Sequence, residues 1–393
     1  MDGKKYSKTY FISLVILVLS CLAFLYYISD TRVTSGVSPI PKLVGLLTGG
    51  KAEHPEETPP EFRNKSVVLA VASCGSENGK LLLTLLKSIL MFTHLPFHVI
   101  VISDKSSREF LAEHLKRLLP NYVSHEFRAA SFPQGYQQPN WEDMFKRCST
   151  ERLFLPSIIW DHDAVIYVDT DSLFLAPIED LWSYFNSMKE EQLIGVVIQH
   201  EPGSEGAWYT WGALPAYKER GLNAGVLLMN LTRMRQSNWE SQMLPTYLKY
   251  KPHIGLADQD ILNAYLHFHP ELVMEIPCIW NYRRTHCDHL KNQCKEAAKD
   301  GAALLHGNKQ VFFTTEHPAF KKVYDALRTF DAQDPQSWTA VTPNPKSKQK
   351  LSYAIQKALK AIPETICNSV PEVFFKRIAG SYPSNSQPVI VRT

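Results

Sequence analysis

Two aspartates separated by one residue interrupt an apolar part of the chain. The segment AVIYVDTDSLFL, residues 164–175, places Asp169 and Asp171 directly after five strand-forming residues and just before a second apolar stretch. Carboxylates are costly to remove from water, so they need a partner in such a place. Two carboxylates past a strand end can converge on one hard divalent cation and on the phosphate oxygens that it bridges. The pattern indicates a metal and diphosphate site, although a turn with solvated or helix-capping acids gives the same letters.

A second polar group follows another apolar stretch, LLHGNKQVF at residues 304–312. His306 comes directly after two leucines, at the end of a predicted strand. Gly307 would let the backbone approach a ligand, and Lys309 would supply a positive charge to a phosphate. A lone histidine is more often structural than a ligand. Combined with the two aspartates, however, its imidazole gives two oxygen donors and one nitrogen donor, a set that suits manganese better than calcium.

Two further segments carry polar side chains at the starts of apolar patterns. Asp258, Gln259 and Asp260 open a helical pattern, and Asn223 and Gly225 precede a strand pattern. Acids at a helix N-terminus interact favourably with the helix dipole, and a glycine before a strand is typical of a turn. The functional interpretation instead points a polar side chain from each segment into a cleft beside a sugar. Neither segment establishes this alone.

The surrounding sequence predicts an α/β fold with a mostly parallel sheet covered by helices on both faces. Apolar runs of strand type alternate with helical patterns, as in sheets of this class. Open α/β sheets bind ligands at the carboxyl ends of their strands, where Asp169 lies. Residues 152–160 suggest a helix that bends or ends near Pro156. The predicted strands are residues 67–72, 97–103, 164–168, 193–199, 225–230 and 304–306, and the predicted helices are residues 81–92, 110–119, 258–267 and 352–361.

An uncharged stretch near the N-terminus predicts a membrane anchor. Residues 10–28 contain no charged side chain and would span about 28 Å as a helix. Lys4, Lys5 and Lys8 precede the stretch and favour a cytosolic N-terminus. A cleavable signal peptide is the alternative, but its apolar region is usually shorter. The predicted organisation is a cytoplasmic tail at 1–9, a signal-anchor at 10–28, a stem at 29–64, a catalytic domain at 65–330 and an extension without an assigned role at 331–393.

Composition and cysteine usage agree with a lumenal body. The 393 residues carry a formal charge of +3 without a basic stripe, which makes nucleic acid an improbable partner. Cys21 lies in the apolar stretch, and the other six cysteines form an even number, as expected where disulfides form. At least one bridge is expected among Cys278, Cys287 and Cys294. Two acceptor sequences for N-glycosylation begin at Asn64 and Asn230.

Taken together and in this order, the motifs resemble those of the family 8 retaining glycosyltransferases. The resemblance covers roughly residues 66–330, and the segments VDTDSLFL, GVLLMNLTRMR, DQDILN, PCIWNYRRTHC and LHGNKQVF are most similar to the glucoside xylosyltransferases. It implies a lumenal catalytic domain of GT-A fold, anchored to the membrane of the endoplasmic reticulum or Golgi as a single-pass type II protein. It also implies transfer of xylose from UDP-xylose, in α linkage, to O-linked glucose on EGF-like repeats of secreted or cell-surface proteins, with Mn2+ as cofactor.

The resemblance also implies roles for individual residues of this chain. Ala224 replaces the commoner serine, which leaves any donor contact by that side chain in doubt. The implied metal ligands are Asp169, Asp171 and His306, the implied nucleotide-sugar contacts are Ala72, Ser73, Arg152, Thr170, Gly307 and Lys309, and the implied catalytic or sugar-pocket residues are Asn223, Asp258 and Gln259.

Several alternatives remain open at this point. The same fold could use UDP-glucose or UDP-galactose on another acceptor, or could be an inactive lumenal sugar-binding protein, against which the intact metal set argues. Phosphatases of the haloacid dehalogenase type also carry two aspartates at a strand end, but after their first strand. Retention by double displacement would need a carboxylate against the sugar, and Asp258 and Asp260 are the nearby candidates. A same-face displacement is favoured. The rings that could exclude a hexose or stack on the acceptor are Trp208, Trp211, Trp280 and Tyr282, for which core packing is the equal alternative.

Overall fold

The computed structural model describes most of the region in which the chemistry is predicted. All the described residues belong to one compact unit. None of the helices formed by these residues has both the length and the apolar character needed to cross a membrane. The predicted anchor and stem, Asn64, Trp208, Trp211 and Lys309 lie outside the described residues. The described residues are 66–93, 95–132, 148, 150–199, 214–287, 292–308, 310–330, 345–361 and 371–380.

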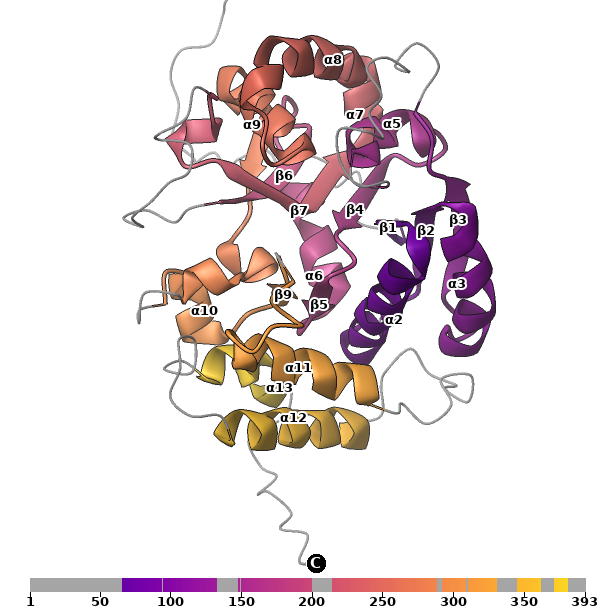
Figure 1. Ribbon diagram of the computed structural model, residues 1–393, viewed down its shortest axis with the longest axis vertical. Coiled ribbons are helices and arrows are strands. Elements are labelled where there is room, and N and C mark those ends of the chain that lie inside the picture. The colour runs from indigo at the N-terminus through magenta and orange to yellow at the C-terminus, as the bar shows by residue number, and fades with distance from the viewer. Residues whose placement is uncertain are drawn as a thin grey trace, which may run out of the picture. The chain divides into compact units, whose positions relative to one another are not determined.

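A seven-stranded sheet forms the centre of this unit, in the order β3-β2-β1-β4-β7-β6-β8 (Figure 1). Neighbouring strands are parallel except that β7 runs antiparallel to both β4 and β6. The predicted mostly parallel sheet is therefore confirmed, with one reversed strand. The strands are β1 Val67–Ser73, β2 Phe97–Ser103, β3 Ser124–Ala129, β4 Ala164–Val168, β6 Ile194–Ile198, β7 Leu222–Asn230 and β8 Val273–Glu275.

The reversal of β7 has a direct effect on the site. Val168, the last residue of β4, pairs with Val226 near the start of β7. The carboxyl end of β4 and the amino end of β7 therefore lie side by side. Gly225 is adjacent to Asp169 for this reason, and Asn223 lies two residues away on the same strand. If β7 were parallel to β4, both residues would lie at the opposite end of the strands.

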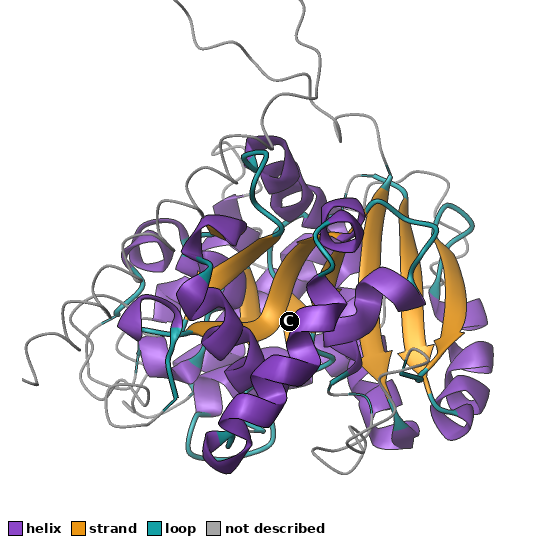
Figure 2. Cartoon of the chain, turned by 90° about the horizontal axis from the view of Figure 1, so that it is seen from above, coloured by secondary structure: helices purple, strands orange, loops and turns teal. Residues whose placement is uncertain are grey.

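Helices lie on both sides of the sheet (Figure 2), as expected when both faces of its strands are apolar. Asp104 caps α3 by accepting a hydrogen bond from the backbone N–H of Ser107. Helix α2 begins six residues before the predicted start. The prediction missed its first turns because their residues are polar and lack the apolar spacing of a helix. The helices are α2 Gly75–Phe92, α3 Lys105–Leu118, α5 Leu155–Ile158, α6 Ile178–Trp182, α7 Leu231–Gln236, α8 Trp239–Tyr250, α9 Asp258–Phe268, α10 Lys295–Asp300, α11 Pro318–Thr329, α12 Pro345–Lys360 and α13 Lys376–Gly380.

A second, two-stranded sheet closes the site. Strand β5, Ser172–Phe174, pairs antiparallel with β9, Leu304–His306. The register places Ser172 opposite His306, so the histidine is adjacent to the two aspartates. Strand β9 has the predicted bounds, whereas β5 was not predicted as a strand, although its residues lie at the apolar stretch noted after the two aspartates.

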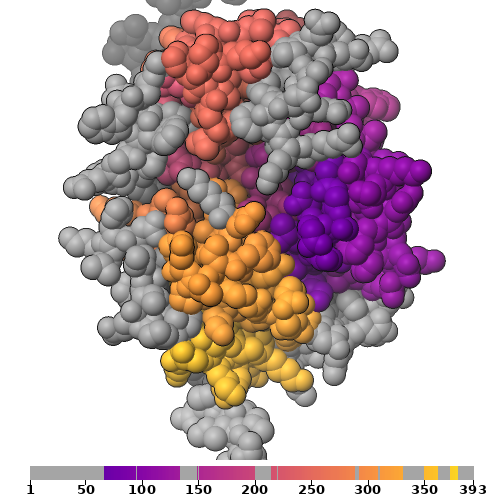
Figure 3. All heavy atoms as spheres, in the orientation of Figure 1, coloured from indigo at the N-terminus to yellow at the C-terminus, as the bar shows by residue number. Residues whose placement is uncertain are grey.

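The segment after residue 330 contributes to the same hydrophobic core. Leu351 and Ile355 of α12 are buried, and this helix packs against α11. In the space-filling view the C-terminal residues, in yellow, lie directly against the orange residues that precede them (Figure 3). Disulfides join Cys74 to Cys148 and Cys278 to Cys294, and the second confirms the predicted bridge in the cysteine cluster.

Candidate functional site

The predicted metal ligands converge at the carboxyl end of β4. The Nε2 atom of His306 lies 3.6 Å from Oδ2 of Asp169 and 3.5 Å from Oδ1 of Asp171. One ligand atom from each side chain falls within 4.8 Å of the others. Neighbouring ligand atoms around one octahedral ion are about 3 Å apart, so a small inward movement would close the three donors around a cation.

The charge state of Asp171 suits this role. Burial by itself would raise the pKa of Asp171, but the charge of His306 and its hydrogen bond outweigh burial, and the pKa is lowered. The anionic form that binds a metal is therefore favoured. Two oxygen donors and one nitrogen donor are a suitable set for a divalent transition metal.

Glycine residues and backbone hydrogen bonds hold these ligands in place. The N–H of Asp169 donates to the carbonyl of Gly225 at 2.9 Å, and the N–H of Gly307 donates to the carbonyl of Asp171 at 2.7 Å. A Cβ atom on Gly225 would lie 2.0 Å from Cε1 of His306. A Cβ atom on Gly307 would lie 2.4 Å from the ring of Phe312, so this glycine makes room for a core side chain.

Arg152 joins the metal ligands to the start of α9. Its guanidinium lies 2.9 Å from Oδ1 of Asp169 and 2.8 Å from Oδ2 of Asp258, and it donates to the carbonyl of Ala224 at 2.6 Å. It also lies 4.7 Å above the ring of Tyr167. Burial opposes its charge, but the two carboxylates outweigh burial and raise the pKa of Arg152. The site thus contains a permanently charged, buried cation.

The two carboxylates proposed as nucleophiles for double displacement are both engaged. Asp258 is 4% exposed, and burial raises the pKa of its carboxyl to about 7 even though Arg152 acts in the opposite direction. Asp260 is fully buried, and its Oδ2 accepts hydrogen bonds from the N–H groups of Gly255 and Leu256, each at 2.7 Å. Asp260 therefore stabilises the turn before α9.

The predicted sugar-pocket amides contact each other. Nδ2 of Asn223 donates to Oε1 of Gln259 at 3.1 Å and to Oε1 of Gln199 at 2.8 Å. Oε1 of Gln259 also accepts from the backbone N–H of Ala224 at 3.2 Å. The structure thus brings Asn223, Asp258 and Gln259 together beside Arg152 and the metal ligands.

The remaining predicted residues take different positions. Thr170 lies half-buried between the two aspartates, and Ala72 and Ser73 end β1. The hydroxyl of Ser73 is buried and pairs with that of Ser107 at 3.0 Å. Trp280 is 3% exposed and Tyr282 is fully buried between His286 and Phe320, so core packing is the correct alternative for these two rings.

Three residues in contact with the site were not predicted from the sequence to be part of it. Asn281 contacts His306, Gln199 contacts Asn223, and the hydroxyl of Tyr167 donates to Oδ1 of Asp169 at 3.1 Å. Tyr167 could have been found, because residues two apart in a strand share a face. The other two are brought to the site by tertiary structure.

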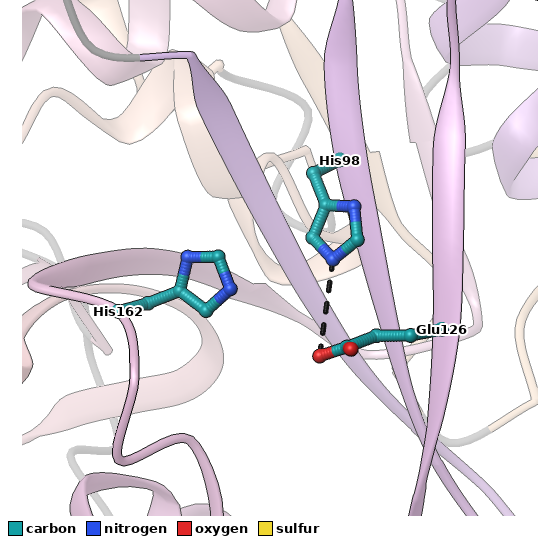
Figure 4. Close-up of side chains that lie close together, drawn as sticks. All are labelled: His98, Glu126 and His162. Atoms are coloured by element: carbon teal, nitrogen blue, oxygen red, sulfur yellow. Dashed lines mark ion pairs between the residues drawn. The ribbon is translucent and has the colours of Figure 1, made fainter.

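A second group of side chains that could bind a metal lies near the amino ends of β2, β3 and β4. His98, Glu126 and His162 approach one another, with Nε2 of His98 3.8 Å from Oε1 of Glu126 (Figure 4). That oxygen already accepts two hydrogen bonds from Arg128, at 2.8 and 2.6 Å, and Arg128 also pairs with Asp161. Because the guanidinium of Arg128 already pairs with the Glu126 carboxylate, we interpret this group as an ion-pair cluster that joins β2, β3 and the turn before β4.

The sequence that contains these residues is similar to a family of known proteins. The family model described as "Glycosyl transferase family 8" matches residues 77–311, which include all three predicted metal ligands. Glucoside xylosyltransferase 2 from Mus musculus is 34% identical over 345 residues, which cover 84% of this chain and 73% of that protein. Glucoside xylosyltransferase 1 from Homo sapiens is 34% identical over 330 residues, which cover 80% and 71%. Among solved structures, the apo form of mouse xyloside xylosyltransferase 1 aligns with a TM-score of 0.49 and 20% identity over 63% of this chain and 99% of that chain.

Proposed function

Because the chain belongs to glycosyl transferase family 8, we propose that this glycosyltransferase transfers xylose from UDP-xylose, in α linkage, to a glucose already O-linked to an EGF-like repeat. The observation that carries the proposal is the convergence of Asp169, Asp171 and His306 at the end of β4, in a chain 34% identical to glucoside xylosyltransferases. The intact ligand set argues against an inactive sugar-binding protein. The choice of xylose rests on these relatives, because Trp280 and Tyr282 are buried in the core.

Enzymes of this family generally depend on a divalent metal, and the three side chains fit one. We assign Mn2+ to Asp169, Asp171 and His306, because manganese accepts both carboxylate and imidazole donors. When bound, the ion would supply positive charge against the diphosphate leaving group. Arg152 is already fixed beside Asp169 and holds that carboxylate in position before any ligand binds.

The surroundings of the carboxylates support a same-face displacement. Asp260 is committed to the turn before α9, and Asp258 is buried against Arg152. A double displacement needs an accessible carboxylate next to the sugar, and neither residue provides one. In the same-face alternative the departing phosphate accepts the proton of the acceptor hydroxyl, and Gln259, held in place by Asn223, orients the sugar.

A donor panel tests the proposed reaction. The purified full-length chain in detergent would be offered UDP-xylose, UDP-glucose and UDP-galactose with a glucosylated EGF-like repeat. We expect UDP-xylose to be used at least about 10-fold better than either hexose donor, because an added hydroxymethyl group in a closed pocket costs about 1–3 kcal/mol. Preference for a hexose, or equal use of the unglucosylated repeat, would overturn the donor or acceptor assignment without affecting the family.

We further propose that the enzyme is a single-pass type II protein of the endoplasmic reticulum or Golgi membrane. The uncharged residues 10–28 and the two disulfides support this proposal. Asn230 is 1% exposed and caps α7, so Asn64 is the candidate glycosylation site. Protease added to sealed microsomes should leave everything beyond about residue 30 intact. Digestion of the body from the cytosolic side would contradict the orientation.

A further inference from the structure

The imidazole of His306 has two nitrogen atoms, and the structure determines which of them carries the proton. Nε2 faces Asp169 and Asp171, whereas Nδ1 lies 2.9 Å from Oδ1 of Asn281. A neutral imidazole can bind a metal only through the nitrogen without a proton. The partner of Nδ1 therefore decides whether Nε2 is available to a cation.

The orientation of the neighbouring Asn223 follows from a backbone group. The N–H of Gly225 donates to Oδ1 of Asn223 at 3.1 Å. Because a backbone N–H can only donate, the atom of Asn223 at this place must be its oxygen. The Nδ2 atom of Asn223 then points to the two glutamine oxygens, Gln199 and Gln259, as a donor should.

This orientation is passed on to Asn281 and from there to the histidine. The atom of Asn281 that lies 2.8 Å from Oδ1 of Asn223 must be a donor, so it is Nδ2. The other amide atom, which faces His306, is then the acceptor Oδ1, and Nδ1 of His306 must carry the proton. We propose that Asn281 is a positioning residue that keeps the Nε2 lone pair of His306 directed at the metal.

Burial makes this chain of hydrogen bonds effective. Asn281 is fully buried, Asn223 is 2% exposed and His306 is 4% exposed. Water therefore cannot easily replace a lost partner, and an unpaired amide would be costly. The backbone of Asn281 is also held, because the buried guanidinium of Arg283 donates to its carbonyl at 3.1 Å. Loss of a group that orients a metal-binding histidine typically lowers metal affinity about 10- to 100-fold, and we expect the same for loss of the Asn281 side chain.

The same chain of hydrogen bonds, from His306 through Asn281 and Asn223, also connects the metal site to the predicted sugar pocket. Asn223 accepts from Asn281 and donates to Gln259, so the metal ligand and the amide of Gln259 share one hydrogen-bonded frame. The inference rests on the metal site of the proposed function but not on which sugar is transferred. Metal binding without donor or acceptor therefore separates its failure from a failure of the donor panel.

The test measures the tautomer and the metal affinity of the full-length chain. Histidines labelled with nitrogen-15 would report the protonation of His306 in the metal-free chain at about pH 8, where an ordinary imidazole is neutral, with the signal assigned by its loss in His306→Gln. Mn2+ affinity would be measured by electron paramagnetic resonance. We expect the proton on Nδ1 in the wild type. Asn281→Ala should reduce this preference and weaken Mn2+ binding about 10- to 100-fold.

Two further variants separate orientation from packing. Asn281→Asp keeps an acceptor for Nδ1, so it should restore the Nδ1 proton and bind Mn2+ more tightly than Asn281→Ala. Asn263→Ala is the matched control, because Asn263 is equally buried and donates to the backbone carbonyls of Leu222 and Gln259. It should leave the tautomer unchanged. A proton on Nε2 in the wild type, or a folded Asn281→Ala with unchanged Mn2+ affinity, would overturn the proposal.

Discussion

Asp171→Asn is expected to abolish Mn2+ binding and to reduce sugar transfer by at least about 1,000-fold, while the domain stays folded. The carboxylate lies 3.5 Å from Nε2 of His306, and its lowered pKa keeps it anionic. An amide of the same shape provides a neutral oxygen in place of a charged one, which weakens its hold on a hard cation. Groups that stabilise charge on a leaving group commonly contribute 10²- to 10³-fold each, so about 1,000-fold is a reasonable bound when the ion is lost.

The measurement combines Mn2+ affinity, thermal unfolding and transfer in the presence and absence of EDTA. Asp300→Asn is a suitable control because Asp300 is exposed on α10 and the substitution makes the same change in charge. It should match the wild type in all three assays. Full activity of Asp171→Asn, or wild-type activity that resists EDTA, would show that the aspartates do not hold a catalytic metal.

Gly225→Ala should remove metal binding through a residue that is not itself a ligand. A Cβ atom at this position would lie 2.0 Å from Cε1 and 2.6 Å from Nδ1 of His306. The strand cannot move aside easily, because β7 pairs with β4 from Val226 onward and the carbonyl of Gly225 accepts the N–H of Asp169. The imidazole must therefore leave its place. We expect Mn2+ affinity to fall by at least about 100-fold and the free energy of unfolding to fall by about 1–3 kcal/mol, as for other overpacked sites.

A second glycine of the same sheet provides the control. A Cβ atom on Gly195 of β6 would lie 3.0 Å from the side chain of Leu228, which crowds the core away from the metal ligands. Gly195→Ala should therefore lower stability and leave the Mn2+ affinity of the folded chain unchanged. If both variants lose metal binding alike, general destabilisation explains the effect. If Gly225→Ala binds Mn2+ like the wild type, His306 is not the ligand that the geometry indicates.

The sequence predicted most of the central buried strands but missed the short strands β5 and β8 and the edge strand β3. Strands β2, β4 and β9 have the predicted bounds, because each is an apolar run that ends at a polar residue. Strand β3, Ser124–Ala129, was missed because it lies at the edge of the sheet, its residues are mostly polar and none of them is fully buried. Edge strands commonly lack the apolar pattern that reveals a central strand. The reversal of β7 was also missed, because strand direction depends on pairing and not on the residues of one strand.

For the candidate site, the sequence alone pointed to the three side chains that converge at the end of β4 but not to the network around them. Asp169, Asp171 and His306 stood out because a charge or an imidazole at the end of an apolar strand is unusual. Asn281 lies in an aromatic segment, where the large rings of Trp280 and Tyr282 drew attention and turned out to be core. The engagement of Asp260 with the turn before α9 could not be predicted either, because it depends on the backbone conformation of Gly255 and Leu256.

The pairing of β5 with β9 has a consequence for how the protein is made. During synthesis the two aspartates emerge long before His306, and the three-residue ladder that joins the two segments places Ser172 opposite His306. So short a ladder is not stable alone in water, and it needs the rest of the fold around it. A nascent chain, or any fragment that ends before His306, therefore lacks the complete ligand set however well β1 to β4 have formed. The candidate metal site can therefore assemble only after the ribosome has delivered β9.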